Sequence, residues 1–109
     1  MDKYNNLFHE LISGLSAIYQ SSMKQVILYG SVARGTDTAE SDIDIAVLVN
    51  DETSERHDRL LDLVTDLNLK YDVVLSVLTI HADHYAAWGN TIPFYKNVQK
   101  DGIQLWKTA

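Results

Sequence analysis

The sequence predicts an α/β fold in which a small mixed sheet is flanked by helices. Apolar residues recur at helical spacing in two long segments. Short runs rich in β-branched residues lie between and after these segments and are typical of strands. The chain has 109 residues, 46% of them hydrophobic, which suits one compact domain with a substantial core. We therefore expect residues 1–109 to form a single domain.

The first part of the chain is expected to supply a helix, two strands and the loop between them. Apolar side chains three and four positions apart predict a helix over residues 3–20. The apolar run 26–29 ends at Gly30 and predicts a buried strand. Residues 31–41 are small, polar and charged, and are expected to be a loop before a second strand at 43–49.

A second long helix is predicted within residues 51–70, with Thr53 or Ser54 capping its start. Its apolar face is expected to lie in the core, not to bind a cofactor. The residues of that face are Leu60, Leu61, Val64 and Leu67.

The C-terminal part is expected to add two strands and two helices. A third strand is predicted at 73–80 and a short helix near 82–88. Pro93 suits the first turn of another helix that runs to about residue 100, and Gly102 suits its end. Residues 103–106 then form a short edge strand.

The composition narrows the functional classes. A formal net charge of −6 argues against a broad nonspecific surface for nucleic acid. The absence of cysteine excludes disulfides and thiolate sites, so a metal would be held by oxygen or imidazole ligands. The N-terminal segment mixes charged and apolar residues, which predicts neither a signal peptide nor a membrane span. We expect a cytoplasmic protein.

Two aspartates stand two positions apart at the start of the second predicted strand. Strand residues i and i+2 point to the same face about 6.6–6.8 Å apart, so Asp42 and Asp44 should project side by side. Carboxylates in such a place are costly unless they are paired or bind a cation. An Asp-x-Asp pair alone is more often a solvated strand end, so its surroundings decide whether it is a metal site.

The predicted topology brings further groups to the same place. The short connection favours antiparallel first and second strands, which places Gly30 and Ser31 beside the two aspartates. The long helix lets the second and third strands run parallel through a right-handed crossover. Asp72 is expected to open the third strand and to lie at the same sheet edge. The prediction is a three-carboxylate site beside a Gly-Ser turn.

A phosphate would fit beside these carboxylates. Gly30 permits a tight turn and a close approach to the backbone. Ser31 offers a hydroxyl, and the turn after it can present N–H groups to an anion. Arg34 is placed to contact a phosphate, although a surface pair with Asp37 or Glu40 is an open alternative.

A triphosphate with magnesium would explain why a phosphate cradle adjoins a carboxylate cluster. Two Mg²⁺ ions about 3.5–4 Å apart would activate the attacking oxygen and stabilise the leaving pyrophosphate. Asp42 and Asp44 are then metal ligands. Asp72 completes one site or helps to deprotonate the attacking hydroxyl.

Gly30-Ser31, ten intervening residues and Asp42-Ile43-Asp44 resemble the signature of the DNA polymerase beta superfamily of nucleotidyltransferases. The longer string GSVARG…SDIDIAV resembles its minimal nucleotidyltransferase (MNT) branch, and FYKNVQKDGIQLW is similar to the end of those short proteins. In that family two motif aspartates and a third acidic residue on a later strand bind magnesium. The resemblance assigns these roles to Asp42, Asp44 and Asp72.

The resemblance also implies a partner. Many MNT proteins are antitoxins that act beside a HEPN-domain ribonuclease toxin, and some transfer AMP from ATP to a tyrosine of that toxin. Two alternatives stay open. One is a non-catalytic module that blocks its partner by occlusion, and the other is nucleotidyl transfer to a small molecule or tRNA. A small-molecule acceptor would require an oligomer or partner to complete the pocket.

Two other groups of residues resemble sites in composition. His81 and His84 flank Asp83, but a zinc site lacks a strong third ligand there. The C-terminal region is dense in aromatic residues, most of which we expect in the core, with some left exposed as a partner surface. These residues are Tyr85, Trp88, Phe94, Tyr95 and Trp106.

Overall fold

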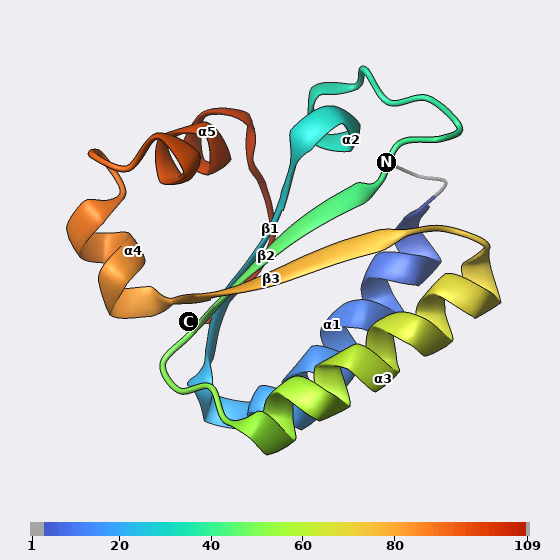
Figure 1. Cartoon of the computed structure of the whole chain (residues 1–109), viewed down its shortest axis with the longest axis horizontal. Coiled ribbons are helices and arrows are strands. Elements are labelled where there is room, and N and C mark those ends of the chain that lie inside the picture. The colour runs from blue at the N-terminus through green and yellow to red at the C-terminus, as the bar shows by residue number, and fades with distance from the viewer. Residues whose placement is uncertain (1–3, 109) are drawn as a thin grey trace.

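The computed structural model describes residues 4–108, which form a four-stranded sheet in the order β3-β2-β1-β4 with helices on both faces (Figure 1). The elements in chain order are α1 (Asn5–Tyr19), the 3-10 turn η2 (Gln20–Ser22), β1 (Met23–Tyr29), α2 (Gly30–Arg34), β2 (Ile43–Val49), α3 (Ser54–Tyr71), β3 (Leu75–His81), α4 (Ala82–Trp88), α5 (Pro93–Asp101) and β4 (Ile103–Lys107). No helix in residues 4–108 is long and apolar enough to cross a membrane.

The strand pairing confirms the predicted mixed sheet. β1 pairs antiparallel with β2, and Tyr29 lies opposite Asp44. β2 pairs parallel with β3 through the α3 crossover, and Asp44 lies beside Ser76. β4 pairs antiparallel with the other side of β1, which makes β3 and β4 the two edges of the sheet.

Alternation along the strands divides the core into two layers. The larger layer lies between the sheet and helices α1 and α3, and contains Ile43, Ile45 and Val47 of β2. The smaller layer contains Ala46 and Leu48 of the same strand. It packs under α4 and α5, which cover the opposite face of the sheet (Figure 1). β2 is therefore covered on both faces, and Asp44 is its one residue that is not buried.

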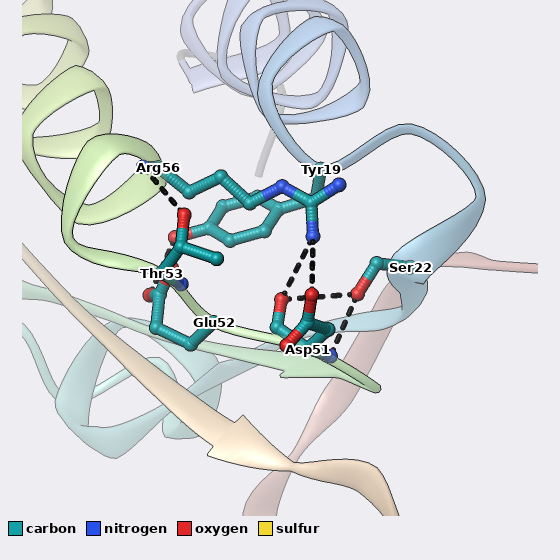
Figure 2. Close-up of polar contacts among 6 residues, drawn as sticks. All are labelled: Tyr19, Ser22, Asp51, Glu52, Thr53 and Arg56. Carbon is teal, nitrogen blue, oxygen red and sulfur yellow. Dashed lines mark hydrogen bonds and ion pairs between the residues drawn. The ribbon is translucent and has the colours of Figure 1, made fainter.

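Polar contacts tie the chain together where β1 begins and β2 has just ended (Figure 2). The Ser22 hydroxyl accepts a hydrogen bond from the Asp51 N–H at 2.8 Å and donates one to the Asp51 carbonyl at 3.1 Å. The buried Tyr19 donates its hydroxyl to Glu52 at 2.8 Å. These bonds fasten the end of α1 to the segment that enters α3.

Thr53 caps α3, as one of the two predicted alternatives. Its hydroxyl accepts a hydrogen bond from the Arg56 N–H at 3.1 Å, which satisfies a free donor in the first turn. The Arg56 guanidinium in turn contacts the Asp51 carbonyl at 3.1 Å and lies 6.0 Å from the centroid of the Tyr19 ring (Figure 2). The start of α3 is thus joined to the same polar network.

Three local expectations were wrong. The predicted loop 31–41 begins as a helix, since residues 30–34 form the short helix α2, which the left-handed conformation of Gly35 ends. Asp72 does not open β3; it ends α3 with φ 52°, and β3 begins at Leu75. Leu61 is half-exposed, since it lies about 100° around the helix from the buried Leu60.

Apolar side chains of and beside the edge strand β3 are exposed on the face of the sheet that carries α4 and α5. Val74, just before the strand, and Leu78 within it are both exposed. Residues 73–80 contain no charged side chain, although charges are a common way to protect an edge strand from pairing with another chain.

Replacing Tyr19 with phenylalanine tests the polar network. The ring stays and one hydrogen bond is lost, so we expect the free energy of unfolding to fall by about 1 kcal/mol. Burial and the bond to Glu52 raise the pKa of Tyr19. Above about pH 10, Tyr19 therefore ionises in the unfolded chain but stays protonated in the folded one. The stability that the Tyr19 hydroxyl contributes is lost as pH rises, and this loss occurs in the wild type but not in the phenylalanine variant.

The measurement is urea denaturation of both proteins between pH 7 and pH 11. The difference in unfolding free energy should narrow above pH 10. A difference that stays constant to pH 11 would mean that Tyr19 is not held protonated by the fold.

Candidate functional site

The site centres on Asp44, the partly exposed carboxylate in the otherwise buried strand β2. Its register partners are Tyr29 on β1 and Ser76 on β3. Register partners on neighbouring strands point to the same face, so these three side chains form one row across the sheet. The row lies on the face that α4 and α5 cover only in part.

Gly30 packs directly against the Asp44 carboxylate. Gly30 has φ 74°, a conformation that side chains disfavour. A Cβ at this position would lie 2.3 Å from Oδ2 of Asp44 and 3.1 Å from its Cγ. Position 30 therefore requires glycine for two reasons: the backbone conformation and the space that the carboxylate occupies.

Asp42 and Asp44 repel one another. Asp42 is exposed and lies just before β2, which begins at Ile43, whereas the prediction placed Asp42 in the strand. Burial and the negative charge of Asp42 raise the pKa of Asp44, while the positive charge of Arg34 lowers it. Burial and the charge of Asp44 also raise the pKa of Tyr29. A bound cation would relieve this repulsion, and the oxygen donors fit a hard divalent ion such as Mg²⁺.

Arg34 lies at the end of α2, close enough to influence Asp44. Its guanidinium forms an ion pair at 3.4 Å with Asp101, at the end of α5. This partner was not among those that the sequence predicts, which are Asp37 and Glu40. Because the Arg34 side chain is half-exposed, this pair contributes little to stability, and a phosphate could compete for the guanidinium.

Asp72, the third predicted ligand, lies near the chain segment that contains Asp42. It ends α3 and lines a surface hollow with Glu40, Ser41 and Ile43, the last of which belongs to the larger core layer. Within residues 4–108, no three acidic or histidine side chains gather as a metal site. The position beside Asp44 on β3 is held by Ser76. The carboxylates that the structure places together are Asp42 and Asp44.

The geometry adds three residues that the sequence interpretation missed. Tyr29 and Ser76 flank Asp44 in the sheet, and Asp101 pairs with Arg34. Side chains alternate between the two faces of a strand, so Ser76 points to the face opposite the buried Leu75. Asp44 likewise points away from its apolar neighbours Ile43 and Ile45, and this alternation could have shown that Ser76 shares its face. Nothing in the sequence signals Asp101, because its contact depends on how α5 packs.

The aromatic C-terminal region lies partly on the same face. Phe94 meets Tyr29 edge-on, with ring centroids 5.6 Å apart and planes at 85°. Tyr95 packs on Phe94 at 6.1 Å, and its hydroxyl makes a hydrogen bond of 2.7 Å with Nδ1 of His84. Trp88 and Phe94 are 49% and 37% exposed, so part of this region faces solvent as expected.

Comparison with known proteins identifies the family. The model of the family described as "Polymerase beta, Nucleotidyltransferase" matches residues 15–108. Two proteins of Methanocaldococcus jannaschii, each named "Putative protein adenylyltransferase", are similar in sequence. One is 35% identical over 97 residues, which cover 89% of this chain and 92% of the relative. The other is 32% identical over 71 residues, which cover 64% and 72%.

Solved structures share the fold. A toxin–antitoxin structure with AMP-PNP aligns over 93% of this chain and 73% of the matched chain, with a TM-score of 0.63 and 24% identity. A complex of a tri-AMPylated Shewanella oneidensis HEPN toxin with an MNT antitoxin aligns over 94% and 72%, with a TM-score of 0.56 and 22% identity. At these identities the structures show the fold alone. The family match and the relative that is 35% identical establish that this chain belongs to the polymerase beta nucleotidyltransferase family and is a nucleotidyltransferase.

Proposed function

We propose that this protein transfers AMP from ATP to a hydroxyl group of a protein partner, with Mg²⁺ bound by Asp42 and Asp44. The observation that carries the proposal is the packing of Gly30 against Asp44, which leaves the backbone at position 30 without a side chain beside two mutually repelling carboxylates. The sequence relatives named as protein adenylyltransferases support AMP as the transferred group and a protein as the acceptor.

Each residue of the site has a separate role in the proposed reaction. Asp42 and Asp44 would bind Mg²⁺, which would neutralise triphosphate charge as the acceptor oxygen attacks the α-phosphorus and pyrophosphate leaves. Gly30 lets the triphosphate approach the backbone, and Ser31 offers its hydroxyl. Arg34 would exchange Asp101 for a phosphate oxygen. The acceptor hydroxyl loses its proton as the new phosphate ester forms.

A HEPN-type toxin is the partner that we propose, with a tyrosine as the acceptor. The support is the fold shared with an MNT antitoxin that was solved with a tri-AMPylated HEPN toxin. Transfer to tRNA is less well supported, because the net charge of −6 disfavours a polyanion.

Occlusion without catalysis is the second candidate. The exposed rings of Trp88 and Phe94 favour it, since exposed aromatic residues are common in protein interfaces. The two functions separate in a variant that lacks the metal ligands. A catalytic antitoxin stops neutralising its partner, whereas an occluding one continues.

Asp44→Asn should abolish transfer without damaging the fold. We expect the rate to fall by more than about 100-fold, because even outer-shell partners of metals are worth 10- to 100-fold. Burial and Asp42 raise the pKa of Asp44, so the fold favours a neutral group there and the melting temperature should not fall.

The assay combines the protein, Mg²⁺, ATP and the product of a neighbouring HEPN gene, and measures added AMP by mass spectrometry. Transfer at the wild-type rate by Asp44→Asn would remove Asp44 from the mechanism. A tight complex with the wild type but no added AMP would favour occlusion.

Gly30→Ala should damage the site more than the fold, and Gly35→Ala is its matched control. Both glycines have φ near 75°, so each alanine should cost about 1–2 kcal/mol of stability. A Cβ on Gly30 meets Asp44, whereas one on Gly35 meets nothing within 4 Å. We expect transfer to fall on the order of 100-fold in Gly30→Ala only, as for a misplaced catalytic group. Equal losses in both variants would point to backbone strain alone.

Asp72→Asn tests the third ligand that the family resemblance assigns. Asparagine tolerates the left-handed conformation of position 72, so the fold should be unaffected. Because Asp72 forms no three-residue metal site with Asp42 and Asp44 within residues 4–108, we expect transfer close to the wild-type rate in the same assay. A loss as large as that of Asp44→Asn would mean that Asp72 moves to the metal when the substrates bind.

A further inference from the structure

We infer that Phe94 is the platform on which the nucleobase of the donor stacks. The inference deepens the proposed function, because it takes the nucleoside triphosphate to bind beside Asp42 and Asp44. It assigns a role to an aromatic side chain that the chemistry of transfer leaves unused.

Phe94 is placed beside the reaction centre by Tyr29. The Tyr29 ring contacts the Phe94 ring, 5.6 Å away by centroids, and Tyr29 is the register partner of Asp44 on β2. In a nucleotide, a ribose separates the base from the α-phosphate. The base must therefore lie near the carboxylates but not in contact with them, and Phe94 offers an aromatic ring that reaches Asp44 through one intervening residue, Tyr29.

The Phe94 ring is held firmly yet stays partly open to solvent. It is 37% exposed, although it follows Pro93 in the first turn of α5 and contacts both Tyr29 and Tyr95. Tyr95 is itself fixed by a 2.7 Å hydrogen bond to His84. A ring that is already ordered loses little entropy when a ligand stacks on it.

Stacking on one ring implies weak discrimination between bases. Every nucleobase has an aromatic face, so stacking tolerates any base. Of the two tyrosine rings that adjoin Phe94, that of Tyr95 already uses its hydroxyl in a hydrogen bond with His84, so stacking is the contact that Phe94 itself offers to a base. ATP and GTP should therefore depend on Phe94 to the same extent.

Trp88 supplies a matched control. It is the more exposed ring, at 49%, and it contacts His84 at 6.4 Å between centroids. Both rings of this contact belong to α4, and neither belongs to the row of Tyr29, Asp44 and Ser76. General effects of removing an exposed aromatic ring should therefore be visible in Trp88→Leu as well as in Phe94→Leu.

The test is calorimetric titration of the full chain with Mg²⁺ and ATP, GTP or inorganic tripolyphosphate. Phe94→Leu keeps apolar bulk without a π face, and we expect it to lose affinity for both nucleotides by about 5- to 150-fold. Its affinity for tripolyphosphate should be unchanged. Phe94→Trp should bind both nucleotides at least as tightly as the wild type, and Trp88→Leu should behave as the wild type.

Wild-type ATP affinity in a folded Phe94→Leu variant would overturn the inference, and so would an equal loss for tripolyphosphate. A wild type that binds tripolyphosphate but not ATP would overturn it as well. No acceptor is present in these titrations, so the result is independent of the proposed acceptor. Phe94-dependent ATP binding without transfer to the partner would support the inference and refute the proposed acceptor.

Discussion

The contact between the Asp44 carboxylate and the Gly30 backbone is the constraint on which the site depends. Asp44 interrupts a central strand that is otherwise buried on both faces, and its oxygen occupies the space of any side chain at position 30. The antiparallel pairing of Tyr29 with Asp44 creates this contact. The end of β1, the start of α2 and the start of β2 are thereby fixed together, which is where a phosphate and a metal would have to meet.

The two ends of the sheet differ in how well their polar groups are paired. Near Ser22 and Asp51, hydrogen bonds satisfy the chain where β1 begins, and Tyr19 is bonded to Glu52. At Asp44, burial and a second carboxylate both disfavour the charged form, and the nearby Arg34 is shared with Asp101. Many proteins keep energetically unfavourable groups at their functional sites. In this protein the partly buried Asp44 beside Asp42 is such a group, and it lies at the Gly30 end of β1.

The order and directions of the strands and the contact between Gly30 and Asp44 could be predicted from the sequence. The positions of Asp72 and Asp101 could not, and that of Ser76 was missed. Connection lengths were enough to deduce the strand directions, and hence the meeting of Gly30 with Asp44. The position of Asp72 was wrong because it depends on how α3 ends. There the backbone turns left-handed at Asp72, and Asn68 accepts a hydrogen bond from the Leu75 N–H at 2.9 Å. The turn occupies residues 72–74, and β3 begins after it. The apolar pattern of a strand does not reveal such a turn.

The uncharged edge strand β3 has a consequence for the behaviour of the protein in solution. Its backbone edge and its exposed Val74 and Leu78 offer a template for a strand of another molecule. Repulsion between copies that each carry a net charge of −6 opposes such pairing, and dissolved salt weakens that repulsion. The colloidal stability of the isolated chain therefore depends on ionic strength, and a partner that covers β3 would remove that dependence.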